Sequence, residues 1–231
     1  MRRMVGLDRL AAWRGRVREP ALTVLLAFEL LVIFVLVPLD GLSVFAPRSF
    51  QVLIASLVVV AAVALIASHR GALVLTLLAA VVGLVADAFR YEWPSDFSTF
   101  AFLLVVLAFL FVLTGVIGRV VFGSGRVSAH RIQGAVVIYL HMAVIFTYLQ
   151  AVVLFFAPGA LGDGLTATDP AVGARLLYFS FTTLTTVGYG DIVPVHPFAR
   201  SLANLEAIVG QLYPATLLAR LVTLEISSRQ E

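Results

Sequence analysis

The sequence predicts an all-α membrane protein with six transmembrane helices and a shorter re-entrant segment between the fifth and sixth. Two observations predict this fold class. The chain of 231 residues is 61% hydrophobic and only 13% charged, whereas soluble domains carry about a quarter charged residues. Its apolar residues also gather in runs near or above the ~20 residues that an α-helix needs to cross the hydrocarbon core.

The apolar runs predict six helices, and short polar breaks with Pro, Gly, Ser or charged residues separate most of them. Runs of this length satisfy their own backbone hydrogen bonds in lipid only as helices. The period-two alternation of a membrane barrel is absent from them. We expect the helices near residues 21–38, 51–68, 71–88, 97–118, 132–157 and 198–222.

The distribution of arginine predicts the orientation. All sixteen basic residues are arginines, and twelve of them fall on the inner side if the N-terminus is inside. By the positive-inside rule we expect a multi-pass protein of the cell (plasma) membrane with both termini in the cytoplasm. The net charge of +3 is small and sits mainly at helix ends, so nucleic acid is not an expected partner. The absence of cysteine excludes disulfides and cysteine metal sites.

The stretch TTLTTVGYGD, residues 182–191, is a polar and glycine-rich interruption between the last two apolar runs. The apolar residues 171–186, which overlap the start of this stretch, are too few to span the membrane. Irregular backbone at membrane depth is tolerated only where protein or water surrounds it, so this stretch is expected to line a watery path. Carbonyls turned to one side can replace the water shell of a cation, and Gly188 and Gly190 permit the dihedrals for that turn. The negative C-terminal end of a half-helix would aim at a cation just below Thr186.

The string TTVGYGD resembles the selectivity-filter signature of potassium channels, with the TVGYG core intact. The resemblance covers roughly residues 131–226. It implies a pore helix over 173–186, a filter over 186–190 and an inner helix over 198–222. It also implies K⁺ as the transported ion and no cofactor. The implied ion-binding residues are Thr186, through carbonyl and hydroxyl, Val187, Gly188 and Tyr189 through their carbonyls, and Gly190 as the end of the filter.

The resemblance also implies residues that support the filter. Tyr178 and Asp191 match a pore-helix aromatic and the aspartate that it bonds in the family, so we expect that contact. Thr182 stands where some bacterial members have a glutamate, so that carboxyl pair is missing. Glu206 is expected to brace the pore helix from behind, near Thr182 or Thr183, with direct ion binding as the alternative.

The sixth helix carries the expected gate. Gly210 matches a hinge glycine of similar channels, and Pro214, one turn later, should kink the helix. The alternative is that the two residues merely ease helix packing. Helical spacing would turn four side chains toward the cavity, the last two of them as an apolar constriction: Gln211, Ala215, Leu218 and Val222.

Six spans with a C-terminal pore resemble the layout of voltage-gated potassium channels. The fourth expected helix, however, has no cation before Arg119 at its inner end. Because such sensors move arginines through the membrane field, we reject voltage sensing of that kind. By depth, Glu29 of the first helix and His141 of the fifth could meet. They are a candidate pH-sensitive pair, or else a packing pair.

The expected organisation is a basic N-terminal segment over 1–20, a four-helix unit over 21–118, a cytoplasmic linker over 119–131, a pore domain over 132–222 and a short cytoplasmic tail over 223–231. The N-terminal segment fits a helix on the inner membrane surface or a partly ordered basic tail. The short tail predicts no cytosolic ligand-binding domain. No nucleophile–base constellation or phosphate loop is present in the sequence, so an enzyme is not expected.

One filter per chain cannot surround an ion, so we expect a homotetramer in membrane lipid. The predicted function is a potassium-selective channel that passes K⁺ passively. Two alternatives stay open: a non-conducting regulatory or K⁺-binding membrane subunit, and a weakly selective cation channel.

Overall fold

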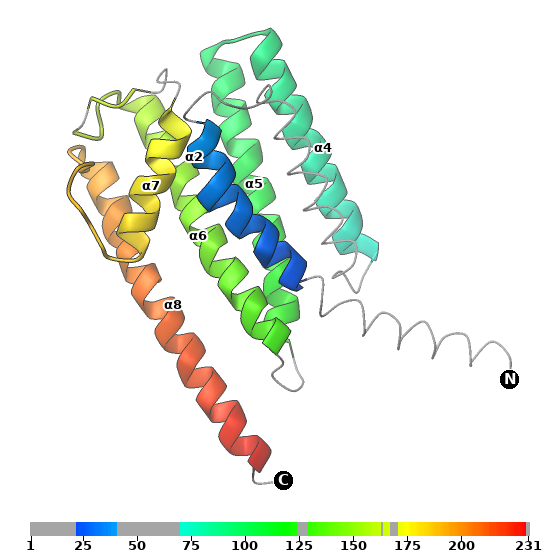
Figure 1. The fold of residues 1–231 in the computed structure, drawn as a ribbon. Helices are drawn as coiled ribbons and strands as arrows, with labels where there is room; N and C mark the ends of the chain where they lie inside the picture. Colours follow the sequence, from blue (N-terminus) through cyan, green and yellow to red (C-terminus); the bar gives the residue numbers. More distant parts are fainter. Residues whose placement is uncertain (1–21, 41–69, 124–128, 163, 167–170, 230–231) are drawn as a thin grey trace, which may run out of the picture.

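The structure is a computed structural model that describes residues 22–40, 70–123, 129–162, 164–166 and 171–229. Its regular elements in this part of the chain are all helices (Figure 1). They are the N-terminal helix (residues 22–31, continued by η1, Val32–Leu36, and α2, Val37–Asp40), α4 (Arg70–Glu92), α5 (Asp96–Val121), α6 (Ala129–Phe156), α7 (Val172–Leu184) and α8 (Pro197–Arg229). The expected segment 1–20 and the expected helix 51–68 lie outside the described residues.

Three of the described helices are long and apolar enough to cross a membrane: Leu22–Leu39, Asp96–Val121 and His130–Phe156. They correspond to the first, fourth and fifth expected spans. The third and sixth expected spans are also present as helices, α4 with 23 residues and α8 with 33. α8 is less apolar because it carries Arg200, Glu206, Gln211 and Arg220 along its length.

Local sequence explains where α5 begins and ends. The Ser95 side chain accepts a hydrogen bond from the Ser98 backbone, and the Ser98 side chain accepts one from the Ser95 backbone. This reciprocal capping box satisfies two of the first free N–H groups of the helix. Asp96 in the first turn and Arg119 in the last turn complement the helix dipole. The helix therefore continues to Val121, three residues beyond the expected end.

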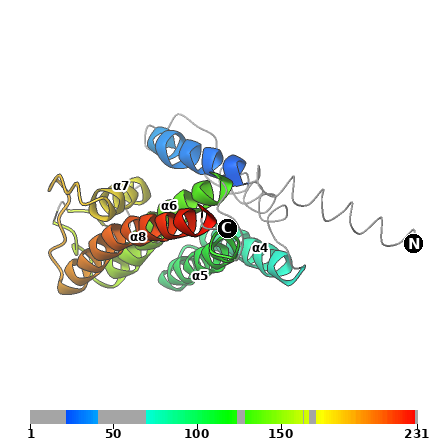
Figure 2. The same ribbon diagram turned by 90° about the horizontal axis from the view of Figure 1, so that it is seen from below.

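The first core joins the N-terminal helix to α5 and α6 of the same chain. Leu25, Leu113, Ile117 and Ala135 are each at most 1% exposed at this junction. α5 also packs along α4 on its other side. Figure 2, which looks along the bundle, shows α4 and α5 on one side and α7 with α8 toward the other. The N-terminal helix and α5 thus pack against α6 of their own chain, and α4 packs against α5.

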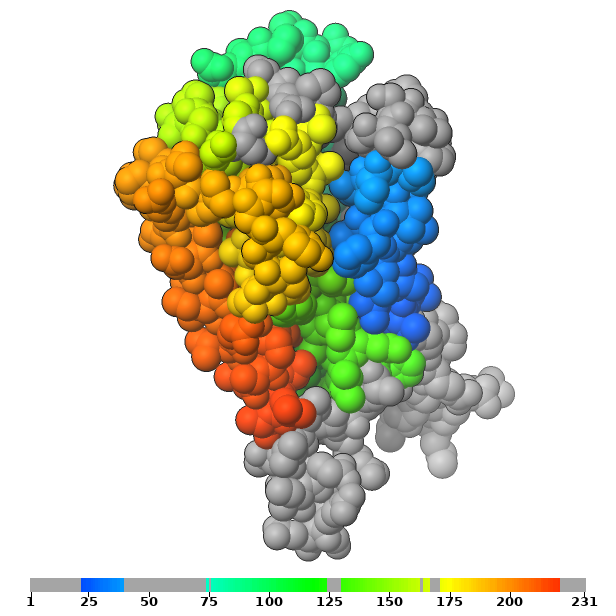
Figure 3. All heavy atoms as spheres, turned by 60° about the vertical axis from the view of Figure 1, so that its left-hand side comes forward, coloured from blue at the N-terminus to red at the C-terminus, as the bar shows by residue number. Residues whose placement is uncertain are grey.

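The second core holds the short helix α7 between α6 and α8. Leu154 of α6, Leu176 and Phe179 of α7, and Ala199 of α8 are buried there together. The chain that follows α6 pairs with the segment before α8, since the Gly162 N–H donates to the Val193 carbonyl at 2.8 Å. This pairing joins the chain before α7 to the chain after it. In Figure 3 the segment after α7 and part of α8 lie uncovered on one face of the molecule.

Candidate functional site: the segment after α7

The backbone after α7 takes an alternating conformation. α7 ends at Leu184, two residues before the expected end, and Thr185 caps it. The φ angles of Thr186, Gly188 and Gly190 are then +58°, +52° and +82°. Left-handed φ at every second residue turns successive carbonyls in a common direction, as the two glycines predict. Thr186 is a β-branched residue in this region, which is a strained conformation of the kind that gathers at functional sites.

Two backbone hydrogen bonds anchor residues 186–190 to α7. The Thr186 N–H donates to the Thr183 carbonyl at 2.9 Å, and the Gly188 N–H donates to the Thr182 carbonyl at 3.1 Å. The Thr182 hydroxyl donates to the Phe179 carbonyl at 2.9 Å. Thr182, an expected support residue, therefore contacts the strand through its carbonyl, and its side chain stays with the helix.

Two tyrosines connect the segment after α7 to that helix. The ring of Tyr189 stacks on that of Tyr178 of α7, with centroids 6.3 Å apart and planes 2° from parallel. Tyr189 therefore points back toward α7. Partial desolvation raises the pKa of Tyr178, and a hydrogen bond with Asp191 and the negative charge of that carboxylate raise it further. Tyr178 therefore lies within the influence of the Asp191 carboxylate, and its phenol stays protonated at neutral pH.

Glu206 lies behind α7, fully buried. Its polar neighbour is the hydroxyl of Ser180, which is also fully buried. We expected Thr182 or Thr183 at this place, and that expectation of the partner is wrong. α7 buries the face of Leu176, Phe179 and Ser180, so Ser180 is turned toward α8. Residue spacing alone does not predict which face of α7 meets α8. The apolar residues Leu176 and Phe179 beside Ser180 were the sequence signal for that face.

Gly210 lies in close contact with the end of α7. A Cβ atom added at Gly210 would fall 1.9 Å from the carbonyl oxygen of Leu184 and 3.1 Å from its Cα. The crossing of α7 and α8 therefore has room only for glycine at position 210. This holds whether or not Gly210 also permits a bend. α8 stays helical through Pro214, one turn later.

The cavity residues expected on α8 share one exposed face as far as they are described. Gln211, Ala215 and Leu218 are all exposed in the single chain, Leu218 by 64%. Gln211 additionally donates from Nε2 to the Thr186 hydroxyl at 2.9 Å. Val222 lies on the same helix, and its side chain is outside the described residues.

Two further contacts tie α8 to the rest of the chain, and sequence reasoning missed both. The Tyr213 hydroxyl donates to the Ala135 carbonyl of α6 at 2.8 Å. The Arg220 guanidinium donates to the Phe122 carbonyl at the end of α5 at 2.8 Å and lies over the Phe122 ring, 5.1 Å from its centroid. The sequence signals for the second contact were an arginine in the last part of α8 and an aromatic residue directly after α5.

The N-terminal helix, α5 and α6 meet at a buried polar cluster away from residues 186–190. Glu29 Oε1 lies 2.5 Å from His141 Nε2, and both side chains are less than a tenth exposed. The other ring nitrogen of His141, Nδ1, is 3.1 Å from the Thr114 hydroxyl of α5. The sequence had placed Glu29 and His141 at one depth, and the two side chains do contact each other.

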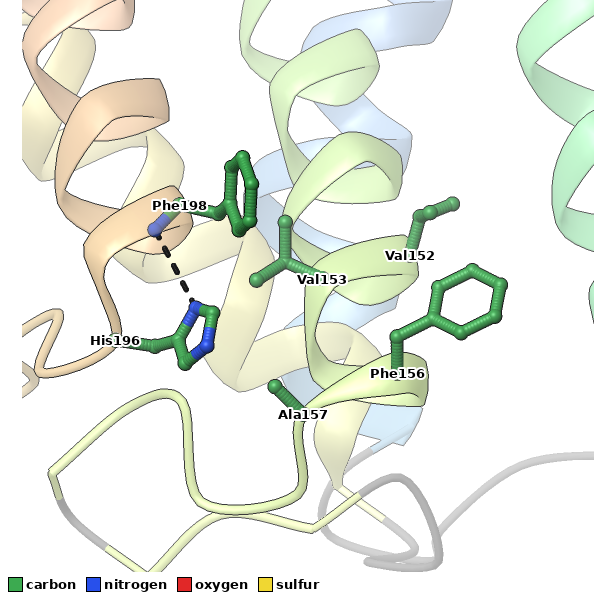
Figure 4. A pocket seen from close by; sticks show the side chains of 6 residues that line it. All are labelled: Val152, Val153, Phe156, Ala157, His196 and Phe198. Carbon is green, nitrogen blue, oxygen red and sulfur yellow. Dashed lines mark hydrogen bonds between the residues drawn. The ribbon is translucent and has the colours of Figure 1, made fainter.

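A pocket of about 430 Å³ opens at the C-terminal end of α6, beside the start of α8 (Figure 4). Its lining is mostly apolar, and the His196 ring accepts a hydrogen bond from the Phe198 N–H at 3.3 Å. No predicted site residue contributes to it. The lining residues are Val152, Val153, Phe156, Ala157, His196 and Phe198.

A short helix followed by an extended segment of alternating left-handed residues, between two long helices, is typical of a membrane ion-channel domain. Comparison with protein families agrees with this class, because residues 132–226 match the model of the ion channel family.

Three curated proteins resemble parts of the chain. The inward rectifier potassium channel Kirbac3.1 of Paramagnetospirillum magnetotacticum is 38% identical over 53 residues, which are 23% of this chain and 18% of that protein. Two pore potassium channel b of Oryza sativa subsp. japonica is 32% identical over 98 residues, 42% of this chain and 25% of that protein. Two pore potassium channel c of the same plant is 35% identical over 81 residues, which are 34% of this chain and 17% of that protein.

The C-terminal part of the chain is therefore similar to ion channels, and the three curated relatives are potassium channels by name. The matched segments span a quarter or less of the length of the curated relatives.

Proposed function

We propose that the chain forms a potassium-selective channel that passes K⁺ passively through a filter made by residues 186–190. The observation that carries the proposal is the alternation of left-handed residues at Thr186, Gly188 and Gly190. It supports a column of carbonyl oxygens from Thr186 to Tyr189, with the Thr186 hydroxyl at the inner end. Such oxygens replace the water shell of a dehydrated cation. The C-terminal dipole of α7 adds negative potential at the same place.

The filter requires further copies of the chain, and we propose a homotetramer. One strand supplies one side of an ion cage, and cyclic symmetry closes the cage with a single kind of interface. The exposure of residues 185–190 in the single chain supports this. α8 also presents an uncovered apolar stripe, with Leu205, Ile208 and Leu212 between 51% and 58% exposed. We propose that a second copy covers this stripe and that Gln211, Ala215, Leu218 and Val222 face the cavity.

The proposed topology has six spans in the cell membrane, both termini in the cytoplasm, and K⁺ and membrane lipid as the other partners. In this arrangement α5 has no arginine before its inner end, so the work of opening does not come from gating arginines. A bend of α8 near Gly210 and Pro214, and an apolar constriction at Leu218 and Val222, form the proposed gate. Pro214 supports the bend because its missing N–H cannot bond the preceding turn.

The buried cluster of Glu29, His141 and Thr114 is a proposed site of pH sensitivity. Protonation of a histidine beside a carboxylate changes the charge of the pair within the membrane. Among the described residues, the groups that face His141 are the Glu29 carboxyl from the N-terminal helix and the Thr114 hydroxyl from α5. We expect His141→Ala to alter the pH dependence of K⁺ flux. A variant with the wild-type pH profile would remove this part of the proposal.

Flux measurement in proteoliposomes tests the proposed function. Vesicles with the wild-type protein should release K⁺ far faster than Na⁺, and Gly188→Asp should abolish the release. Gly115→Ala is a matched control, because a Cβ at that position of α5 meets nothing within 4 Å. Equal rates for K⁺ and Na⁺ would favour a weakly selective cation channel. Binding of K⁺ without any flux would favour a non-conducting subunit.

A further inference from the structure

Three threonine hydroxyls near the end of α7 have different partners. The hydroxyl of Thr182 donates to the Phe179 carbonyl at 2.9 Å, and that of Thr185 donates to the Phe181 carbonyl at 2.6 Å. Both hydroxyls are thereby used by the backbone of their own helix, as is usual for helical threonines. The hydroxyl of Thr186 instead accepts a hydrogen bond from Gln211 Nε2 of α8 at 2.9 Å.

The close crossing of α7 and α8 makes this bond reachable. Gly210, the residue before Gln211, has room for no Cβ against the Leu184 backbone. Leu184 is the last residue of α7, so the same contact brings the amide of Gln211 beside Thr186. The left-handed φ of Thr186 turns that residue away from the last helical turn. Both side chains are exposed in the single chain. In the proposed channel this is the side where the filter opens into the inner cavity.

A hydroxyl has one hydrogen and two lone pairs. When one lone pair of Thr186 Oγ1 accepts the amide N–H, the rotation of the hydroxyl is restricted. The second lone pair is then held available for a cation at the inner end of the filter. The amide oxygen of Gln211 remains free to accept hydrogen bonds from the water around an incoming ion. A nonpolar side chain at position 211 would leave the threonine hydroxyl free to rotate.

We propose that Gln211 is a positioning residue for the innermost cation site, where it holds the Thr186 hydroxyl as an ion ligand. The inference rests on the proposed filter and adds to it a determinant from α8. It differs from a purely structural role, in which the bond only closes the gap between two helices. A structural bond would affect assembly, whereas a positioning bond affects the affinity for a cation.

Binding of Ba²⁺ measures this affinity directly, because Ba²⁺ has a radius close to that of K⁺ and twice its charge. The full-length tetramer is titrated with Ba²⁺ in Na⁺ buffer by calorimetry, and K⁺ flux is measured on the same preparations. We compare the wild type with Gln211→Leu, Thr186→Val and the double variant. Thr216→Val is the control, because the Thr216 hydroxyl bonds only carbonyls of its own helix, Leu212 at 2.8 Å and Tyr213 at 3.0 Å.

We expect Gln211→Leu to weaken Ba²⁺ binding about fivefold or more, the effect of one hydrogen bond. In the Thr186→Val background the same change should have no further effect, because the hydroxyl it positions is gone. Thr216→Val should bind like the wild type. Gln211→Met, which is unbranched and of similar length, replaces the leucine variant if that variant does not assemble.

Wild-type affinity in an assembled Gln211 variant would overturn the inference, and so would fully additive effects of the two substitutions or a wild type that binds no Ba²⁺. A wild type that shows the expected binding pattern but no K⁺ flux would overturn the proposed function and leave the inference standing. The two failures are therefore distinguishable.

Discussion

Replacement of Gly210 by alanine should destabilise the channel and stop K⁺ flux. The added Cβ would lie 1.9 Å from the Leu184 carbonyl oxygen and 2.8 Å from its carbonyl carbon. These atoms belong to the backbone and cannot rotate away, so α7 and α8 must separate by roughly 1 Å. A shift of that size would also lengthen the 2.9 Å bond between Gln211 and Thr186 beyond hydrogen-bond distance.

The energetic balance predicts the sign of the effect. Overpacking in a close-packed interior costs about 1–3 kcal/mol, and backbone clashes fall at the upper end. Alanine in place of glycine within a helix stabilises the folded state by about 1 kcal/mol. The net effect of Gly210→Ala is therefore destabilising by about 1–2 kcal/mol. The same substitution at Gly115 of α5 meets no atom within 4 Å, so only the helical gain remains there.

The assay combines K⁺ flux with thermal dissociation of the proposed tetramer, followed by size-exclusion chromatography. The comparison also separates two roles of Gly210. If the residue served only as a hinge, alanine would stop flux while it left the stability equal or higher. If the residue is required by packing, alanine lowers both. A Gly210→Ala protein as stable as Gly115→Ala, with wild-type flux, would refute the close contact and the reasoning built on it.

Three more predictions concern the support of the filter. Gly188→Ala should reduce K⁺ flux strongly in the flux assay, because left-handed φ costs a residue with a Cβ about 1–2 kcal/mol. Glu206→Ala should lower the stability of the tetramer in thermal dissociation by about 2 kcal/mol through the space it leaves beside Ser180, and Glu206→Gln, which keeps the volume, much less. The raised pKa of Tyr178 means that its bond to Asp191 is fully present below pH 10 and is lost as the pH rises through the shifted value. Tyr178→Phe should remove that alkaline loss of stability, and an unchanged pH profile would contradict the role of the bond.

The backbone conformation of residues 186–190 was predictable from sequence because it is a local property of a few residues. Glycines at alternate positions permit left-handed φ wherever they stand, and the observed angles at Gly188 and Gly190 follow. The contact of Tyr178 with Asp191 followed from matching positions in the family. The meeting of Glu29 and His141 followed from depth, because the rise along a helix is fixed.

Contacts that depend on the rotation of one helix against another were not predictable in this way. Glu206 was expected near Thr182 or Thr183 and lies beside Ser180, because tertiary packing decides which face of α7 meets α8. Gly210 was expected as a hinge, and its steric role appeared only with Leu184 beside it. The bond from Arg220 to the Phe122 carbonyl joins residues 98 positions apart, and spacing along the chain carries no signal for it.

The most direct test of the proposed potassium selectivity is the reversal potential of the purified channel in a planar bilayer with K⁺ on one side and Na⁺ on the other. A potassium-selective filter should give a potential far from zero, of the sign that K⁺ permeation gives, and Gly188→Asp should abolish the current and with it this potential. A current that reverses near zero would contradict the proposed selectivity, since it would mean that residues 186–190 do not select K⁺ over Na⁺.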